Sequence, residues 1–247
     1  MNSIHQTIRP PLQLFRTMPA PCPYLPGRTE RRLIVDLAGG DAPARFDELS
    51  RAGFRRSHSY AYRPACAGCA ECVAVRVRVA DFRPGRTLSR IVSRNGDLTG
   101  LIVAARVTDE QFRLFRVYQR VRHGEGNMAL MTFADYRAMV EETPVDTALL
   151  EYRDGANALR AVCLVDLLSD GPSAVYSFFD PALAPRSLGN FMVLDLIARA
   201  RAAGQPHVYL GYWIADSRKM SYKMRFQPLQ ALGLHGWRDL EPGTPQG

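Results

Sequence analysis

Three cysteines at two-residue gaps are the first candidates for chemistry in this sequence. Cys66, Cys69 and Cys72 stand in the stretch YAYRPACAGCAEC, and Cys22 is a possible fourth member of the group. Four thiolates can hold zinc or an iron–sulfur cluster, but these two intervals are too short for a typical pair of zinc knuckles. The pattern favours a thiol cluster that packs the N-terminal arm, and we predict no metal and no other cofactor.

Arginines surround this run of cysteines. Arg55 and Arg56 precede it, Arg63 lies within it, and Arg76 follows it. A guanidinium offers a carboxylate two parallel N–H donors, which a lysine ammonium cannot do. Solvated surface charge is the alternative, because that is the usual environment of arginine. We predict that at least two of the four contact a substrate or RNA.

Two tyrosines close to these arginines have two equal interpretations. Tyr24 lies in the N-terminal arm, and Tyr62 lies inside the cysteine-rich stretch. Both can pack the arm against the rest of the protein, or line a pocket for a substrate. We keep Tyr24 and Tyr62 as candidate substrate-binding residues.

The densest basic stretch of the chain is SRKMSYKMRFQP, at residues 217–228. Lys219 and Lys223 are four residues apart, so on a helix they would share one face and could neutralise two neighbouring phosphates. Arg218 and Arg225 add to the same stretch. A solvated basic turn is the alternative interpretation.

The overall composition agrees with a polyanionic partner. The 247 residues include 32 Lys and Arg against 24 Asp and Glu, a formal net charge of +8. This charge suits RNA, DNA or an acidic membrane, and a basic enzyme without such a partner is the alternative. No stretch approaches the roughly 20 apolar residues that cross a membrane, and no secretion signal is recognisable. We expect a soluble cytoplasmic protein with reduced cysteines.

The first part of the chain must position the cysteines and arginines. Six prolines between residues 10 and 27 exclude a helix or a central strand and predict an extended, docked arm. The strict alternation of VAVRVRV, residues 73–79, predicts a strand with valines on one face and arginines on the other. With a boundary near residue 105, residues 1–105 are predicted to form an N-terminal domain.

The second part of the chain alternates between helical and strand patterns. Thr108 and Gln111 form a capping box before a helical apolar pattern, and Thr132 starts a second helix. Three β-rich runs follow between residues 148 and 180, then a helix from about Leu188 to Gly204, then a strand at 207–214. This order predicts an α+β fold with a mostly antiparallel sheet over residues 106–235, followed by a flexible tail at 236–247.

Several motifs resemble one family. YLGYWI at 209–214 and SRKMSYKMRFQP resemble the C-terminal half of the arginyl/leucyl-tRNA–protein transferases, which act on protein N-termini. CPYLPGR at 22–28 and GFRRSHSYAYRPAC at 53–66 are similar to the N-terminal half. The similarity extends over about residues 14–235 and is greatest with the bacterial branch, which transfers leucine to N-terminal Asp or Glu.

The resemblance implies a GNAT-like C-terminal domain that takes an aminoacyl group from tRNA. It implies Leu-tRNA and proteins with N-terminal Asp or Glu as partners, no membrane or DNA partner, and a product marked for degradation. Arg-tRNA is the alternative donor. Coenzyme A is a further alternative, but in RSLGNF, residues 186–191, the bulky Phe191 replaces a small residue of the pyrophosphate-binding loop.

The resemblance also assigns roles to the candidate residues. The arginines and tyrosines named above would bind the acceptor, and the basic stretch would bind tRNA. Asp180 could orient the acceptor ammonium or accept its proton, although a turn cap before Pro181 is an equal interpretation. Tyr212 or a nearby backbone amide could stabilise the oxyanion. A protein α-amine has a pKa of about 7.7–8.0, so we expect positioning to matter more than a strong base.

Overall fold

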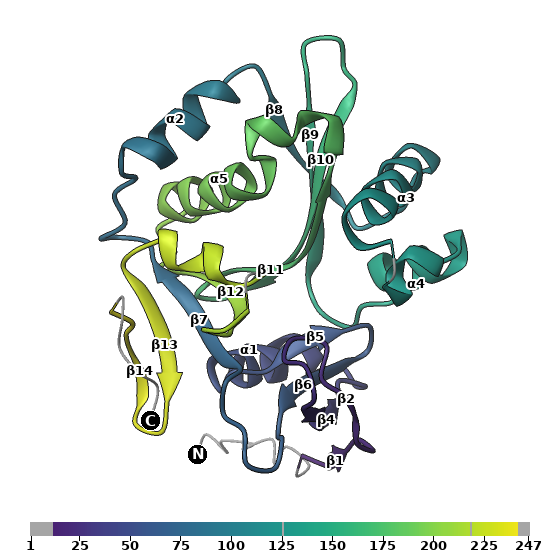
Figure 1. Ribbon diagram of the computed structural model, residues 1–247, viewed down its shortest axis with the longest axis vertical. Helices are drawn as coiled ribbons and strands as arrows, with labels where there is room; N and C mark the ends of the chain where they lie inside the picture. Colours follow the sequence, from purple (N-terminus) through teal and green to yellow (C-terminus); the bar gives the residue numbers. More distant parts are fainter. Residues whose placement is uncertain (1–11, 125, 218, 242–247) are drawn as a thin grey trace, which may run out of the picture.

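The computed structural model describes residues 12–124, 126–217 and 219–241, and these residues form two β-sheets and a small strand pair (Figure 1). The larger sheet has the order β14 (Gly236–Asp239), β13 (Leu229–Gly233), β7 (Val73–Arg78), β12 (His207–Trp213), β11 (Gly171–Phe179), β10 (Leu159–Leu168), β9 (Thr147–Arg153), β8 (Thr99–Ala104). The smaller sheet has the order β1 (Leu14–Arg16), β4 (Arg32–Asp36), β6 (Tyr60–Pro64), β5 (Arg55–Ser57). The remaining pair is β2 (Ala20–Pro21) with β3 (Thr29–Glu30).

Helices cover the sheets. The α-helices of the described residues are α1 (Ala42–Arg51), α2 (Arg86–Arg94), α3 (Asp109–His123), α4 (Phe133–Glu141) and α5 (Leu188–Ala202). Short 3₁₀ helices are η1 (Asn127–Leu130), η2 (Pro181–Arg186) and η3 (Ser221–Arg225). The sequence analysis predicted α3, α4 and α5 but neither α1 nor α2.

The predicted helix boundaries are confirmed where local caps define them. The Thr108 side chain accepts a hydrogen bond from the Gln111 N–H, and the Gln111 side chain accepts one from the Thr108 N–H. Thr132 begins α4 with an equivalent capping box. Gly204 follows α5 with φ +67°, a left-handed conformation that glycine adopts without steric penalty. The positions of these helix ends are therefore determined by residues close to one another in the sequence.

One face of the large sheet packs against α5 and α2. Val75, Val77 and Val79 are each 1% exposed or less and belong to a core cluster that also contains residues of both helices. The alternation predicted for residues 73–79 is therefore correct, with Arg76 on the opposite face from the buried valines. Figure 1 shows α2 and α5 together on one side of the sheet and α3 and α4 on the other.

Two further clusters cover the opposite side. Phe115 of α3, Tyr136 of α4 and Phe178 of β11 form an aromatic cluster beneath α3 and α4. Phe46 of α1 and Tyr209 of β12 belong to a separate cluster, which joins the small sheet to the large one. The small sheet is thus packed onto the large sheet through α1 and β12.

The large sheet extends across the predicted domain boundary. Strands β7 and β8 precede residue 105, yet β7 pairs with β12 and β13, and β8 pairs with β9. Residues 73–104 therefore belong to the large sheet and not to a separate N-terminal unit. Residues 236–239, which we assigned to a flexible tail, form β14 against β13, and residues 242–247 lie outside the described residues.

The predicted α+β class is confirmed. Among the described strand pairs, β11 with β12 is parallel and the others are antiparallel. Residues 12–27 of the predicted arm contain β1 and β2 and are otherwise irregular, and β1 docks against β4. Within the part of the chain that the structure describes, no helix combines the length and apolarity needed to cross a bilayer.

Candidate functional site

The parallel strands β11 and β12 separate soon after they meet. They pair only at Ser173 and Tyr209, and β12 then shifts its register at Gly211, which has φ +75°. Residues 174–177 are half-buried even though β11 is an interior strand of the sheet. We call the region where residues 174–177 of β11 and 211–213 of β12 are not paired with each other the strand gap.

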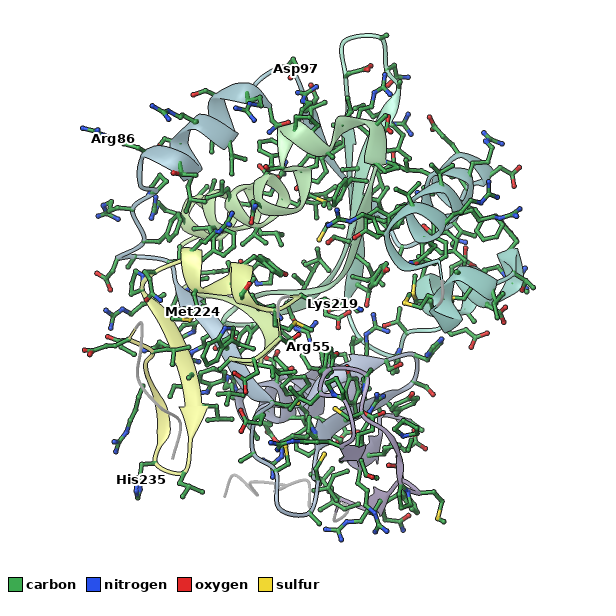
Figure 2. The ribbon with its side chains drawn as sticks, in the orientation of Figure 1. Arg55, Arg86, Asp97, Lys219, Met224 and His235 are labelled. Carbon is green, nitrogen blue, oxygen red and sulfur yellow. The ribbon has the colours of Figure 1, made fainter. Side chains whose placement is uncertain are left out.

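Arg55 of β5 reaches from the small sheet to the start of the strand gap (Figure 2). Its Nη1 donates to Ser173 Oγ at 3.1 Å, and its Nη2 donates to the Ala174 carbonyl oxygen. Both acceptors are neutral, and no ion pair of Arg55 is found among the described residues. The guanidinium is half-buried. The gap therefore begins at a positive charge that no carboxylate neutralises.

The space on the α1 side of Arg55 is too small for a substrate. A cavity of about 10 Å³ lies there, lined by residues that include Phe54, Arg55, Ser173 and Trp237. Such a volume holds about one water molecule. This cavity therefore cannot hold the side chain of a substrate.

Gly211 leaves room for the Arg55 guanidinium. A Cβ atom at this position would lie 3.0 Å from Arg55 Cζ, closer than ordinary van der Waals contact, and the backbone is left-handed. We predict that Gly211→Ala destabilises the protein by about 1–2 kcal/mol through backbone strain alone. It should also displace the guanidinium from Ser173 and lower activity at least tenfold.

Gly204→Ala is the matched control for this prediction. Gly204 has a similar φ of +67°, but a Cβ there would have no neighbour within 4 Å. Thermal unfolding and activity should be measured for both variants. We expect both variants to lose a similar amount of stability, and only Gly211→Ala to lose activity. If the two variants are equally active, the space that Gly211 leaves for Arg55 is not needed for activity.

Lys223 of η3 is buried beside the same gap. Its Nζ donates to the Tyr212 carbonyl oxygen, lies 3.4 Å from Met220 Sδ and is 5.9 Å from the centroid of the Tyr222 ring. The side chain is 5% exposed. Burial, followed by the nearby charge of Arg55, lowers the pKa of Lys223 to about 7. The amine is therefore largely enclosed, and this position is unsuited to the predicted phosphate contact.

Tyr212 connects the two sheets through its hydroxyl group. The Tyr212 Oη lies 2.9 Å from the Gly53 carbonyl oxygen and 3.0 Å from the Tyr62 carbonyl oxygen. Since a phenol has one proton, these two acceptors compete for it. Burial raises the pKa of Tyr212 strongly, so the hydroxyl stays protonated. The contacts do not support the predicted oxyanion role, because the proton is already engaged by backbone carbonyls.

Comparison with known proteins places the chain in one family. The description "Arginine-tRNA-protein transferase, N terminus" matches residues 20–90, and "Arginine-tRNA-protein transferase, C terminus" matches residues 110–233. The chain belongs to the arginine-tRNA-protein transferase family. The resemblance seen in the sequence is therefore confirmed, and the protein is a transferase.

Curated relatives match almost the whole chain. An aspartate/glutamate leucyltransferase of Paramagnetospirillum magneticum is 56% identical over 239 residues, which cover 97% of this chain and 98% of the relative. An aspartate/glutamate leucyltransferase of Gluconacetobacter diazotrophicus is 52% identical, with 94% of this chain and 90% of the relative covered. The similarity therefore includes both sheets and the strand gap.

A solved structure has a related fold. L-PGS from Bacillus licheniformis matches with a TM-score of 0.50 at 13% identity, over 65% of this transferase and 58% of that chain. At this identity the match concerns the fold alone. Together with the mostly antiparallel sheet, it confirms the GNAT-like fold predicted from the sequence.

Asp180 occupies the turn after β11, far from Arg55. Its carboxylate accepts a hydrogen bond from the Ala182 N–H at 3.0 Å and pairs with Arg160 Nη1 at 2.9 Å. Seven residues separate Asp180 from Ser173, which corresponds to roughly 20 Å along a strand. The contacts are those of the turn cap that we considered as an alternative, and they do not support the predicted catalytic role.

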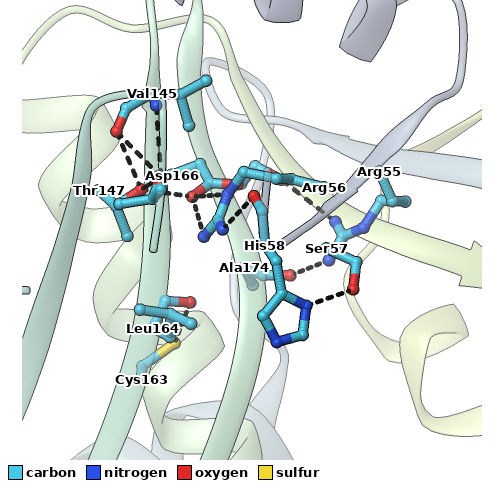
Figure 3. A network of polar contacts seen from close by, with 12 residues as sticks. Arg55, Arg56, Ser57, His58, Val145, Thr147, Cys163, Leu164, Asp166 and Ala174 are labelled. Atoms are coloured by element: carbon cyan, nitrogen blue, oxygen red, sulfur yellow. Dashed lines mark hydrogen bonds and ion pairs between the residues drawn. The ribbon is translucent and has the colours of Figure 1, made fainter. Parts of the chain in front are cut away.

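Arg56 points away from the strand gap, on the opposite face of β5 from Arg55 (Figure 3). Its Nη2 lies 2.8 Å from Asp166 Oδ1, and both side chains are 1% exposed. Thr147 Oγ1 donates to the same carboxylate at 2.9 Å. This enclosed ion pair joins the small sheet to β10, so the predicted substrate contact of Arg56 has no support in the structure.

The other two candidate arginines are held by neutral groups. Arg76 donates to Gln230 Oε1 at 2.9 Å, and its Cζ lies 4.3 Å from the Trp237 ring centroid. Arg63 is exposed, with its Cζ 5.4 Å from the centroid of the Phe54 ring. The structure thus places the four candidate arginines in four different environments, and only Arg55 borders the strand gap.

The candidate tyrosines pack together under the arm. Tyr62 lies beneath the Arg32 guanidinium, at 5.1 Å from the ring centroid, and its ring lies 6.2 Å from that of Tyr212. Burial raises the pKa of Tyr24 to about 12, and the neighbouring Tyr62 contributes in the same direction. These contacts agree with the packing interpretation of Tyr24 and Tyr62.

The cysteines of the N-terminal segment lie close to one another. Cys22, Cys66, Cys69 and Cys72 are free and half-buried. Burial, and then the proximity of the other three thiols, raises the pKa of Cys72 to about 12. Among residues 12–124, 126–217 and 219–241, no group of His, Cys, Asp or Glu has an arrangement that could hold a metal ion. The absence of a metal stays a prediction.

The basic stretch is divided by the structure. Lys219 and Arg225 are exposed, Lys223 is buried, and Arg218 lies outside the described residues. The prediction that Lys219 and Lys223 share one face of a helix is wrong, because η3 begins only at Ser221. Among the described candidates, only Lys219 and Arg225 are therefore exposed enough to contact a phosphate.

Phe191 does not obstruct the start of α5. Its side chain is 9% exposed and packs in the core, with its ring 5.6 Å from the Tyr152 ring in an edge-to-face arrangement. The steric argument against coenzyme A that we based on Phe191 is therefore wrong. The helix periodicity predicted for residues 188–204 already placed this residue on the apolar face.

Sequence reasoning missed Ser173 and Gly211. Ser173 follows an Asp-Gly-Pro turn, and nothing in its sequence context marks its contact with an arginine 118 residues away. Gly211 could have been identified, because a glycine inside a strand pattern often marks a bulge or a close approach of another group. A larger hollow of about 440 Å³ lies between the β5–β6 turn and α4, where His58, Met131 and Asp135 are among its lining residues, and the candidate arginines and tyrosines do not line it.

Proposed function

We propose that this protein transfers leucine from Leu-tRNA to the N-terminal Asp or Glu of other proteins and thereby marks them for degradation. The family assignment supports the class of reaction, and the two relatives named aspartate/glutamate leucyltransferase support this donor and these acceptors. The observation that carries the acceptor assignment is Arg55, a half-buried guanidinium with neutral partners at the edge of the strand gap.

The acceptor's acidic side chain binds Arg55 in this proposal. A carboxylate entering through the gap would meet a guanidinium that has donors and no competing carboxylate. Arg56 cannot bind the acceptor carboxylate, because its charge is already neutralised by Asp166 in a buried ion pair. A charge-assisted, bidentate contact favours Asp and Glu over Asn and Gln, which lack the negative charge.

The donor occupies the strand gap on the side of β12 and α5. Two buried polar atoms of these elements have no hydrogen-bond partner among the described residues: Trp213 Nε1 at the end of β12 and Asn190 Oδ1 in the first turn of α5. Unpaired buried polar groups are uncommon and point to a ligand or water that completes them. A donor and an acceptor for hydrogen bonds suit the hydroxyl and carbonyl groups of an aminoacyl ester.

Lys219 and Arg225 contact tRNA phosphates. Both are exposed, and neither has an ion pair within the described part of the chain. We predict that Lys219→Ala with Arg225→Ala lowers the slope of log K against log salt for tRNA binding by about two units, one for each phosphate contact. Binding should be measured by filter retention between low and physiological salt.

Arg45→Ala is the control for this measurement. Arg45 lies on α1 and pairs with Asp41 at 3.0 Å, so its charge is already neutralised. The salt slope should be unchanged in this variant. A double variant with the wild-type slope would show that Lys219 and Arg225 do not contact phosphates.

The function is tested by presenting both donors and all acceptor classes together. The purified protein is incubated with Leu-tRNA or Arg-tRNA and with peptides that begin with Asp, Glu, Asn, Gln, Lys or Arg, and the products are identified by mass. Leucine on the Asp and Glu peptides alone is the expected result. Transfer from acetyl-coenzyme A, or tRNA binding without any transfer, would contradict the proposal.

Arginine is the second candidate donor. The description of the matching family names an arginine-tRNA-protein transferase, whereas the two relatives are named leucyltransferases. The same incubation separates these donors. We place the reaction in the cytoplasm, with no membrane or DNA partner, because its donor is an aminoacyl-tRNA.

A further inference from the structure

The enclosed amine of Lys223 is poorly satisfied as a charged group. An ammonium has three N–H donors, but among the described residues Lys223 has one carbonyl acceptor, the Tyr212 oxygen, and one weak sulfur acceptor, at Met220. The residue is 5% exposed, so little of the amine is accessible to solvent. Burial of an ammonium without full pairing favours its neutral form. The geometry therefore holds a neutral amine next to the strand gap.

The groups that face Lys223 strengthen this tendency. Arg55 from β5 contributes a positive charge, and the Tyr212 backbone of β12 and the Tyr222 ring of η3 are uncharged. Burial raises the pKa of Tyr222 to about 12, so this phenol stays neutral. No carboxylate contacts the Lys223 amine among the described residues, and nothing nearby compensates its charge.

We propose that Lys223 accepts the proton that the acceptor's α-ammonium must lose before it attacks the aminoacyl ester. This inference rests on the proposed function. The neutral Lys223 amine takes one proton from the α-ammonium and later releases it to solvent. The attacking nitrogen forms the N–C bond, the ester C–O bond breaks, and the nitrogen's second proton goes to the ribose oxygen.

The acceptor's own carboxylate assists this step. In the free protein the positive charge of Arg55 disfavours a proton on Lys223. When an Asp or Glu side chain binds Arg55, its negative charge offsets this effect. A negative charge favours the protonated amine and so raises the pKa of Lys223 above its value in the free protein. An acidic first residue thereby makes the proton transfer to Lys223 easier, in addition to its contact with Arg55.

The test compares Lys223→Met and Lys223→Arg with the wild type. Single-turnover rates are measured from pH 5.5 to 8.5 with Leu-tRNA and an Asp peptide. We expect Lys223→Met to lose at least about 100-fold, the usual range for removal of a proton acceptor. Its rate should rise with pH only through the pKa of the peptide amine, at a higher pH than the rising limb of the wild type.

Lys223→Arg separates proton transfer from a structural role. An arginine keeps the positive charge and can donate to the Tyr212 carbonyl oxygen, but it cannot release a proton in this pH range. Loss of activity in both variants, with thermal unfolding close to that of the wild type, is the expected result. Activity of Lys223→Arg within threefold of the wild type, or a Lys223→Met profile parallel to it, would overturn the proposal.

A variant that fails to fold does not end the test. The wild type alone should show a higher midpoint of the kcat profile with an Asp peptide than with an Asn peptide, because only the first raises the pKa of Lys223. Equal midpoints contradict the inference. Failure of the wild type to transfer leucine or arginine to any peptide would instead contradict the proposed function.

Discussion

Arg55→Ala should lower kcat/KM for peptides that begin with Asp or Glu by about 30- to 4,000-fold. This range corresponds to the roughly 2–5 kcal/mol lost when one partner of a desolvated, charge-assisted pair is removed. Affinity for tRNA should stay nearly unchanged, because the proposed phosphate contacts are made by the exposed Lys219 and Arg225 and not by Arg55. Kinetics with saturating Leu-tRNA provide the measurement.

Two further substitutions sharpen this result. Arg55→Lys should be nearly as harmful as Arg55→Ala, because a lysine ammonium lacks the planar fork that can bind a carboxylate through two parallel hydrogen bonds. Arg63→Ala is the matched control, since Arg63 is exposed on the neighbouring strand β6. A loss in Arg63→Ala equal to that in Arg55→Ala would contradict the assignment of Arg55.

Arg56→Ala should destabilise the fold by about 3–5 kcal/mol, because it leaves Asp166 as an unpaired buried charge. The two side chains are 1% exposed and 2.8 Å apart, and the pair joins β5 to β10. Urea unfolding gives the free energy directly. For a chain of this size the melting temperature should fall by about 10 °C, since each kcal/mol corresponds to about 2–4 °C.

The double variant Arg56→Met with Asp166→Leu is the control for this prediction. It removes both charges together, so much of the lost stability should return. If Arg56→Ala loses less than about 1 kcal/mol, the pair does not hold the small sheet in place, and Arg56 becomes available again as a substrate-binding residue.

Local signals in the sequence predicted much of the fold. The boundaries of α3 and α4 depend on hydrogen bonds between residues three apart, which the sequence displays directly. The face of β7 depends on strict alternation, which burial of Val75 and Val77 confirms. The family motifs predicted the GNAT-like fold. The extent of the large sheet was not predictable in this way, because β7 pairs with β12 and β13 across more than 100 residues.

The candidate site was harder to predict for the same reason. Arg55 and Arg56 are neighbours in the chain, but consecutive side chains of a strand point to opposite faces. The sequence analysis assigned no strand to residues 55–57, so it missed that Arg55 contacts Ser173 while Arg56 contacts Asp166. Lys223 was misassigned because a spacing of four residues implies a shared face only within a continuous α-helix, and η3 starts after Lys219.

The most direct test of the account is a double-mutant cycle between the enzyme and its acceptor. The wild type and Arg55→Gln are each assayed with matched peptides that begin with Asp and with Asn, and the ratio of the four kcat/KM values gives the coupling between guanidinium and carboxylate. Our account predicts a coupling of at least about 30-fold, equivalent to about 2 kcal/mol. If Arg55→Gln loses activity equally with both peptides, the carboxylate is recognised elsewhere and the account is wrong.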